Sequence, residues 1–140
     1  DDGNPIVGGS DYPVELANPF HGLHAAVTRQ DHNNQPKGGW LPEQKLTLTE
    51  ALRAFTVDAA YGAYQEEMMG TLAPGSWADF ILIDRDVFTI APEQIWQTKV
   101  LGTYVAGQQQ YPAPSAAPNT DSVASDATAK DAKVSPPAKE

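Results

Sequence analysis

The chain has 140 residues, a formal net charge of −9 and no cysteine. An acidic protein without a cluster of Lys and Arg cannot neutralise many phosphates, which argues against nucleic acid or an anionic membrane surface as a partner. The lack of cysteine excludes disulfide bonds and thiolate metal sites and leaves the cellular compartment open. No apolar run approaches the length that spans a membrane.

The N-terminal part contains a short apolar run, Pro5–Val7, followed by the sequence GGSDYPVE. The run predicts one buried strand, and Gly, Ser, Asp and Pro are residues that tight turns select. Asp11 therefore has two interpretations: a turn residue, or a carboxylate at the end of a barrel strand that faces a metal or a substrate. The segment alone does not decide between them. Because the chain opens without Met in a loop-like DDGNP, we expect the protein's N-terminus to lie upstream.

Two helices are predicted in the first half of the chain. Apolar residues at helical spacing indicate a helix over 19–28, with Asn18 as its N-cap. A second helix is expected near 48–63, because Thr47 and Glu50 have the spacing of a capping box before an apolar stripe. This helix can break around residue 56. The polar, Gly- and Pro-rich segment between the two helices predicts a loop.

The second half of the chain is predicted to form mainly short strands. The expected elements are a strand start at 71–72, a buried strand at 80–83, a helical turn at 92–96, and a hairpin with strands 100–105 and 108–111. Trp96 is expected in the core or on a sheet face of this β-region. Residues 112–140 are rich in Ala, Pro, Ser and Lys and predict a disordered tail.

This order of elements predicts an α/β protein with an incomplete sheet. One strand that leads into a helix needs strand neighbours for its N–H and C=O groups and cover for its apolar side chains. We therefore expect the last βα unit of a larger parallel sheet, followed by a small β-domain.

Four motifs resemble the C-terminal part of the amidohydrolase superfamily, in the branch of the N-substituted formamide deformylases. They are GSD, AAVTR, LTEALRAFT and G-x-L-x-P-G-x-x-ADF, in this order between about 5 and 111. The resemblance implies a TIM-type (β/α)8 barrel with a small β-sandwich, the composite urease-like amidohydrolase fold. This chain would be a fragment of it: 1–68 the last barrel strand and helices, 69–111 strands of the β-sandwich, and 112–140 the tail.

The resemblance further implies that Asp11 ends the eighth barrel strand and is both catalytic and a metal ligand. A divalent metal activates water, and the aspartate accepts its proton and passes it to the leaving nitrogen. Zinc is the default metal, with one or two ions in the parent protein, and iron or manganese would also fit. The family's other ligands are a His-x-His, a carboxylate or modified lysine, and two further histidines, and all are expected upstream of this chain. The segment alone is then expected to be inactive, with no metal of its own.

Other residues have less specific interpretations. Trp40, in the loop between the helices, is a candidate substrate-binding residue, and a role as a hydrophobic plug is an equal alternative. His21 and His24 share a helix face, and His32 follows in the loop. A solvated or substrate-lining role is favoured for these three histidines over metal ligation.

The predicted function is hydrolysis of a non-peptide C–N bond, amide or formamide, by metal-activated water. The expected partners are the N-terminal portion of the same hydrolase, a small-molecule amide substrate and, for a homo-oligomer, a second copy of the chain. Neither nucleic acid nor a membrane is expected. The alternative is a non-catalytic module that pairs with a partner chain through exposed strand edges.

Overall fold

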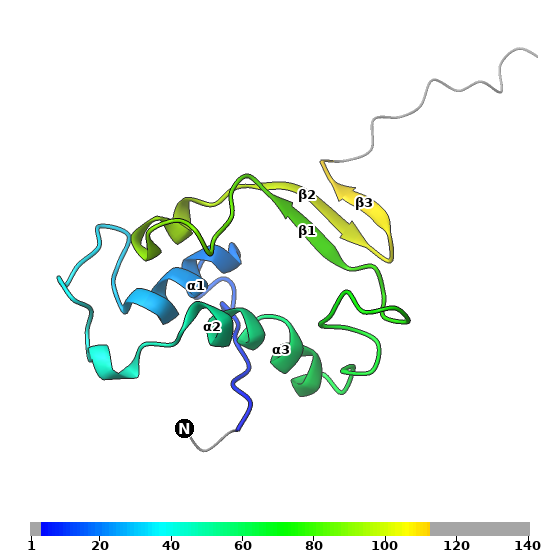
Figure 1. Ribbon diagram of the computed structural model, residues 1–140, viewed down its shortest axis with the longest axis horizontal. Helices are drawn as coiled ribbons and strands as arrows, with labels where there is room; N and C mark the ends of the chain where they lie inside the picture. Colours follow the sequence, from blue (N-terminus) through cyan, green and yellow to red (C-terminus); the bar gives the residue numbers. More distant parts are fainter. Residues whose placement is uncertain (1–3, 113–140) are drawn as a thin grey trace, which may run out of the picture.

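The computed structural model describes residues 4–112, which form short helices and one small sheet (Figure 1). The predicted tail lies outside the described residues apart from Pro112. Within the described part of the chain, no helix is long and apolar enough to cross a membrane. The elements in order are α1 Pro19–Thr28, the 3-10 helix η1 Pro42–Gln44, α2 Leu48–Ala54, α3 Val57–Gly62, β1 Phe80–Ile83, the 3-10 helix η2 Pro92–Gln97, β2 Val100–Val105 and β3 Gln108–Tyr111.

Helix α1 has the bounds and the cap that the sequence predicts. The side chain of Asn18 accepts a hydrogen bond from the N–H of Phe20 at 3.1 Å, which satisfies one of the free donors of the first turn. The helix ends at Arg29, whose left-handed backbone (φ 57°) lets its N–H donate to the carbonyl of Ala25. The helix thus buries the stripe that contains Phe20 and Leu23.

The second predicted helix is divided into α2 and α3. The capping box is confirmed: Glu50 N–H donates to Thr47 Oγ1 at 3.2 Å, and Thr47 N–H donates to Glu50 Oε2 at 2.7 Å. The break also lies where the sequence indicates it, because Thr56 has a non-helical backbone (φ −130°, ψ −90°). The Thr56 hydroxyl donates back to the carbonyl of Leu52, a side-chain bond of the kind that bends helices.

The hydrophobic core lies where α1, α2 and η2 meet. Helix α1 packs against both η2 and α2, and Ile95 of η2 is 1% exposed. The buried members of this core are Phe20, Leu23, Ala51, Val87 and Ile95. The same packing fixes η2 and the loop after α1 relative to each other.

The three strands form one antiparallel sheet in the order β1-β2-β3. The strands expected at 80–83, 100–105 and 108–111 are confirmed, as is the hairpin turn at Ala106-Gly107. Both turn residues have positive φ, as a type I′ hairpin requires. Two expectations about this region are wrong. No strand begins at 71–72, and β1 is not buried, since Ile81 is 43% exposed. The physical reason is that no second layer covers the sheet among residues 4–112.

The strand expected at Pro5–Val7 does not form, so the predicted βα unit lacks its strand. Ile6 and Val7 are each 56% exposed, and the segment is irregular (dark blue in Figure 1). A strand needs neighbours to pair with its backbone, and the described residues supply none here. One backbone bond, from Gly8 N–H to the carbonyl of Ala54 at 2.9 Å, holds the end of this segment to α2.

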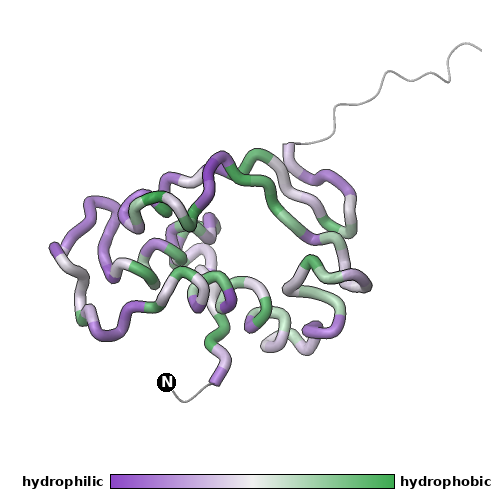
Figure 2. Tube along the Cα trace, viewed as in Figure 1, coloured by the Kyte–Doolittle hydropathy of each residue, from purple (hydrophilic) through white to green (hydrophobic). Residues whose placement is uncertain are grey.

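An open apolar groove of about 680 Å³ separates the helices from the sheet. Its walls are residues of α3, such as Ala59 and Ala63, and residues of β1 and β2, such as Ile81 and Val105. Figure 2 shows the hydrophobic stretches along β1 and β2. Several large apolar side chains in and around this region are exposed, among them Leu72 and Trp77.

Candidate functional site

Asp11 begins a tight turn directly after the irregular N-terminal segment. Its backbone is left-handed (φ 48°), and its carbonyl accepts a hydrogen bond from Val14 N–H at 2.8 Å. Aspartate is one of the few residues other than glycine that tolerates this backbone region. The side chain is exposed and makes no hydrogen bond or ion pair to residues 4–112. Within the described part of the chain, neither carboxylate oxygen of Asp11 is occupied by a protein group.

The position of this turn depends on close packing around Phe55. A Cβ on Gly8 would lie 2.8 Å from the Phe55 ring, and a Cβ on Gly22 would lie 2.6 Å from it. Because neither glycine has a side chain, the segment before Asp11 and helix α1 both approach the same ring. Phe55 thereby sets the distance between the turn of Asp11, α1 and α2.

A cavity of about 390 Å³ lies beside this turn. Gly9 and Ser10 line it on one side, His21 of α1 and His32 of the following loop on another, and Phe55 contributes to its wall. Its volume suits a small molecule. Asp11 follows Ser10 in the chain and is not itself one of the residues that line the cavity.

The three histidines come together around Trp96. The ring centroids of His21 and His32 are 4.3 Å apart, those of His24 and His32 are 6.1 Å apart, and His32 stacks on Trp96 at 5.0 Å. His24 is fully buried, and its Nε2 lies 3.1 Å from Asn34 Oδ1. The expectation that Trp96 belongs to the core or sheet face of the β-region is wrong, because η2 carries it onto the loop after α1. No local pattern in the sequence indicates this meeting, since it joins three segments through tertiary packing.

Burial lowers the pKa of His24 below its ordinary value of 6.5, and the hydrogen bond that His24 donates to Asn34 opposes this effect. Burial and the neighbouring His32 and His24 also lower the pKa of His21. Both effects favour the neutral form of these two imidazoles over the charged form. A neutral imidazole can act as a hydrogen-bond donor or acceptor at the cavity wall.

Trp40 lies on the surface at the C-terminal end of α1, with 62% of its area exposed. The guanidinium of Arg29 lies 4.9 Å from the centre of its ring, and Arg29 Nε–H donates to the Trp40 carbonyl at 3.0 Å. The cavity beside Ser10 is not lined by Trp40. The structure therefore brings Trp40 to Arg29 rather than to the cavity, and a substrate contact for Trp40 stays a prediction.

Two adjacent glycines shape the loop that carries Trp40, and they provide a matched test. Gly38 and Gly39 have φ of 86° and 88°, yet a Cβ at Gly38 meets open space, whereas a Cβ at Gly39 would overlap the carbonyl oxygen of Thr28. Each alanine substitution should lower the free energy of unfolding by about 1 kcal/mol because of backbone strain. Gly39→Ala should lower the free energy of unfolding by about 2 kcal/mol more, measured in urea, because a backbone atom must move. Equal losses would contradict this description of the loop.

The described residues do not complete a metal site. No group of three or more His, Cys, Asp or Glu side chains among residues 4–112 is arranged to hold a metal ion. In addition, His24 is fully buried, and His21 packs against His32 in the cluster around Trp96. The free carboxylate of Asp11 fits the role of one oxygen ligand, while a catalytic zinc site takes about three protein ligands. The remaining ligands would have to come from other residues.

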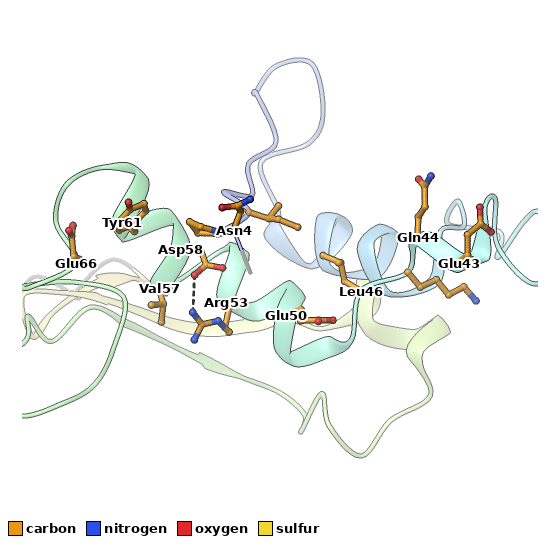
Figure 3. Close-up of a pocket in the computed structure, with 13 residues that line it drawn as sticks. Asn4, Glu43, Gln44, Leu46, Glu50, Arg53, Val57, Asp58, Tyr61 and Glu66 are labelled. Carbon is orange, nitrogen blue, oxygen red and sulfur yellow. Dashed lines mark hydrogen bonds and ion pairs between the residues drawn. The ribbon is translucent and has the colours of Figure 1, made fainter. Parts of the chain in front are cut away.

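A larger hollow, of about 840 Å³, lies along α2, α3 and residues 4–6. Its side chains are mostly polar, and within it the guanidinium of Arg53 points to Asp58 at 3.1 Å (Figure 3). Neither Asp11, Trp40 nor any of the three histidines lines it. We therefore place the candidate site at the smaller cavity beside Ser10 and Asp11.

Comparison with known proteins gives a consistent picture. The model of a family described as "Amidohydrolase family" matches residues 1–111. "Protein LONG AFTER FAR-RED 3" of Arabidopsis thaliana is 36% identical over 79% of this chain and 18% of its own length. "Putative amidohydrolase YtcJ" of Bacillus subtilis (strain 168) is 33% identical over 74% of this chain and 20% of its own length.

A third relative is "N-substituted formamide deformylase" of Arthrobacter pascens, 29% identical over 73% of this chain and 18% of that protein. The chain thus spans about a fifth of the length of the curated relatives it matches. No solved structure matches it.

Proposed function

The chain belongs to the amidohydrolase family, and we propose that it supplies the C-terminal part of a metal-dependent hydrolase. The substrate is a small, non-peptide molecule with an amide or formamide C–N bond. One relative is named as a formamide deformylase, and this supports a substrate of that class. The whole chain on its own is proposed to be inactive.

The observation that carries the proposal is the exposed turn of Asp11, which directly follows Ser10 of the cavity wall. Asp11 stands in an exposed turn, with no protein partner among residues 4–112, and Ser10 lines the cavity next to it. Carboxylates without a protein partner, close to a cavity, are common among ligand-binding and catalytic groups. The match to the family over residues 1–111 gives this carboxylate its proposed role.

Asp11 has two tasks in the proposed reaction. One carboxylate oxygen binds a divalent metal, for which we propose zinc, with iron or manganese as the alternatives that the same ligand type allows. When bound, such a metal supplies water of lowered pKa as the nucleophile. The other oxygen of Asp11 accepts a proton from the attacking water and returns it to the nitrogen that leaves. The remaining metal ligands come from the N-terminal portion of the same hydrolase.

We further propose that this N-terminal portion completes the fold as a (β/α)8 barrel with a β-sandwich. Three features of the described residues support the proposal. The segment 5–7 exposes apolar side chains where a strand is expected. The groove between the helices and the sheet is open and apolar. The outer strands β1 and β3 each have one edge without a strand neighbour among residues 4–112.

The test compares the full-length protein with residues 1–140 alone. Formate or acid release is measured on N-substituted formamides and simple amides, with dipeptides as the matched negative substrates. We expect the full-length protein to hydrolyse members of the first group, to lose activity in a chelator, and to regain it on addition of Zn²⁺. We expect no turnover from residues 1–140. Activity that a chelator leaves unchanged, or turnover by residues 1–140 alone, would contradict the proposal.

The exposed strand edges favour a second function for the same surface, a binding module that performs no chemistry. In that case a full-length protein would bind no divalent metal and hydrolyse none of these substrates. The chain would still form a stable complex through β1 or β3. The assay and a metal analysis of the same sample separate the two functions.

A further inference from the structure

A cluster of three imidazoles joins the loop after α1 to the helix on one side and to η2 on the other. His21 and His24 belong to α1, His32 belongs to the loop, and Trp96 belongs to η2. His32 is the central ring, within 4.3 Å of His21 and 5.0 Å of Trp96 between centroids. His21 and His32 also line the cavity beside Ser10. Any change in the charge of this cluster would therefore act on one wall of that cavity.

The hydrogen bonds around His24 assign its proton. The Thr28 hydroxyl donates to the carbonyl of His24 at 2.7 Å, so its oxygen can only accept from the nearby His24 Nε2. Asn34 Oδ1, at 3.1 Å from the same nitrogen, is a second acceptor. Because both acceptors face Nε2, the hydrogen of the neutral ring lies on Nε2, and Nδ1 carries the lone pair. His24 Nδ1 is buried and has no hydrogen-bond partner among the described residues.

A second proton on this ring would consequently be costly. It would place an N–H donor and a positive charge at a buried nitrogen that no described protein atom faces. In addition, a charged His24 would lie close to the rings of His21 and His32, where like charges repel. The ring reaches water only if the loop or η2 moves away from α1.

Charged groups on every neighbouring segment act on the cluster. Glu15, in the turn before α1, favours a charged His21. Asp31 of the loop and Glu93 of η2 favour a charged His24. Burial is the largest effect for both histidines and acts in the opposite direction, so the pKa of each remains below the ordinary value of 6.5. The neutral forms of His21 and His24 are thus favoured above pH 6.5. Their contribution to the stability of the fold is lost as the pH falls through the lowered pKa values of these two residues.

We propose that His21, His24 and His32 form an acid-sensitive latch that holds the loop 30–36 and η2 against α1. As the pH falls, protonation of His21 and His24 releases the loop and opens that wall of the cavity. The loop is otherwise well organised within itself, since Asp31 Oδ1 accepts from Asn33 N–H and Gln35 N–H at 2.8 and 2.9 Å. It can therefore move as a unit once the ring contacts of His32 with His21 and Trp96 are lost. The latch does not depend on the proposed hydrolase activity.

Hydrogen exchange read by mass spectrometry on the full-length protein tests the latch, because peptides covering 29–40 and 90–99 report on it in a chain of any size. Rates are corrected for intrinsic exchange at each pH. We expect the corrected exchange rate of both peptides to rise about 10-fold between pH 7.5 and pH 5, a change typical of the loss of one buried polar interaction. The hairpin peptide 100–111 contains no histidine and should stay unchanged.

Two variants decide the cause. His24→Gln, which cannot take up a proton, should abolish the acid-induced rise. His32→Gln removes the charge that helps to lower the pKa of His21 and His24, so the acid-induced rise should be smaller in this variant than in the wild type. If peptides 29–40 and 90–99 of His24→Gln already exchange rapidly at pH 7.5, the result for His32→Gln alone decides whether the latch exists. No rise in the wild type, a parallel rise in the hairpin, or a wild-type profile in the variants would overturn the latch.

Discussion

Asp11→Asn should lower the turnover of the full-length hydrolase by about 10³-fold and leave its fold intact, the loss typical of removing a general acid–base. Asparagine keeps the size and the turn-forming property of aspartate, and the carbonyl of residue 11 still accepts from Val14 N–H. What is lost is the proton acceptor and one charged metal ligand. The measurement is kcat and KM on the best formamide substrate found, with circular dichroism to check the fold.

Glu67→Gln is the matched control for this substitution. It also removes one negative charge from an exposed side chain, in the turn after α3 and away from the cavity. Turnover of this variant should stay close to that of the wild type. If Asp11→Asn and Glu67→Gln were equally active, Asp11 would have no part in the reaction, and the interpretation of Asp11 as a simple turn residue would stand.

Ile95→Ala should lower the free energy of unfolding by about 2–5 kcal/mol, the usual loss for a large-to-small substitution in a core. Ile95 is 1% exposed and belongs to the cluster where α1, α2 and η2 meet. The cavity that alanine leaves can be refilled only in part, because its neighbours come from three different elements. The loss is measured by urea unfolding of the full-length protein, with peptide-level hydrogen exchange to place the effect in residues 19–97.

Ile81→Ala provides the comparison for Ile95→Ala. The same side chain is removed, but Ile81 is 43% exposed on β1, so the loss in the described structure should stay below about 1 kcal/mol. If the N-terminal portion covers the sheet in the full-length protein, Ile81→Ala will cost more there than in residues 1–140. Equal losses for Ile81→Ala and Ile95→Ala in residues 1–140 would contradict the position of the core.

The elements that could be predicted from the sequence are those with local causes. The capping box of Thr47 and Glu50 and the cap at Asn18 are formed within a few residues of the helices they begin. The hairpin turn at 106–107 needs positive φ, and glycine at its second position supplies it at low cost. Such interactions do not depend on the rest of the fold, and the predicted bounds of α1 and the hairpin match the structure.

The features that could not be predicted depend on distant partners. The apolar run 5–7 has the composition of a buried strand, but a strand forms only beside other strands, and none lies near it in the part of the chain that the structure describes. The three histidines share no pattern that indicates a cluster, because Trp96 and Asn34 reach them through the packing of η2 and the loop. Asp11 lies between these cases: its turn could be predicted from the sequence, while the catalytic role proposed for it rests on the resemblance to the family.

The most direct test of the central claim is the metal content of the full-length protein by native mass spectrometry, beside Asp11→Asn and residues 1–140. The account predicts one or two divalent ions in the full-length protein, at least one fewer in Asp11→Asn at the same free metal concentration, and none in residues 1–140. Equal metal content in the wild type and Asp11→Asn would show that Asp11 is not a ligand. A metal-free full-length protein would contradict the assignment to a metal-dependent hydrolase.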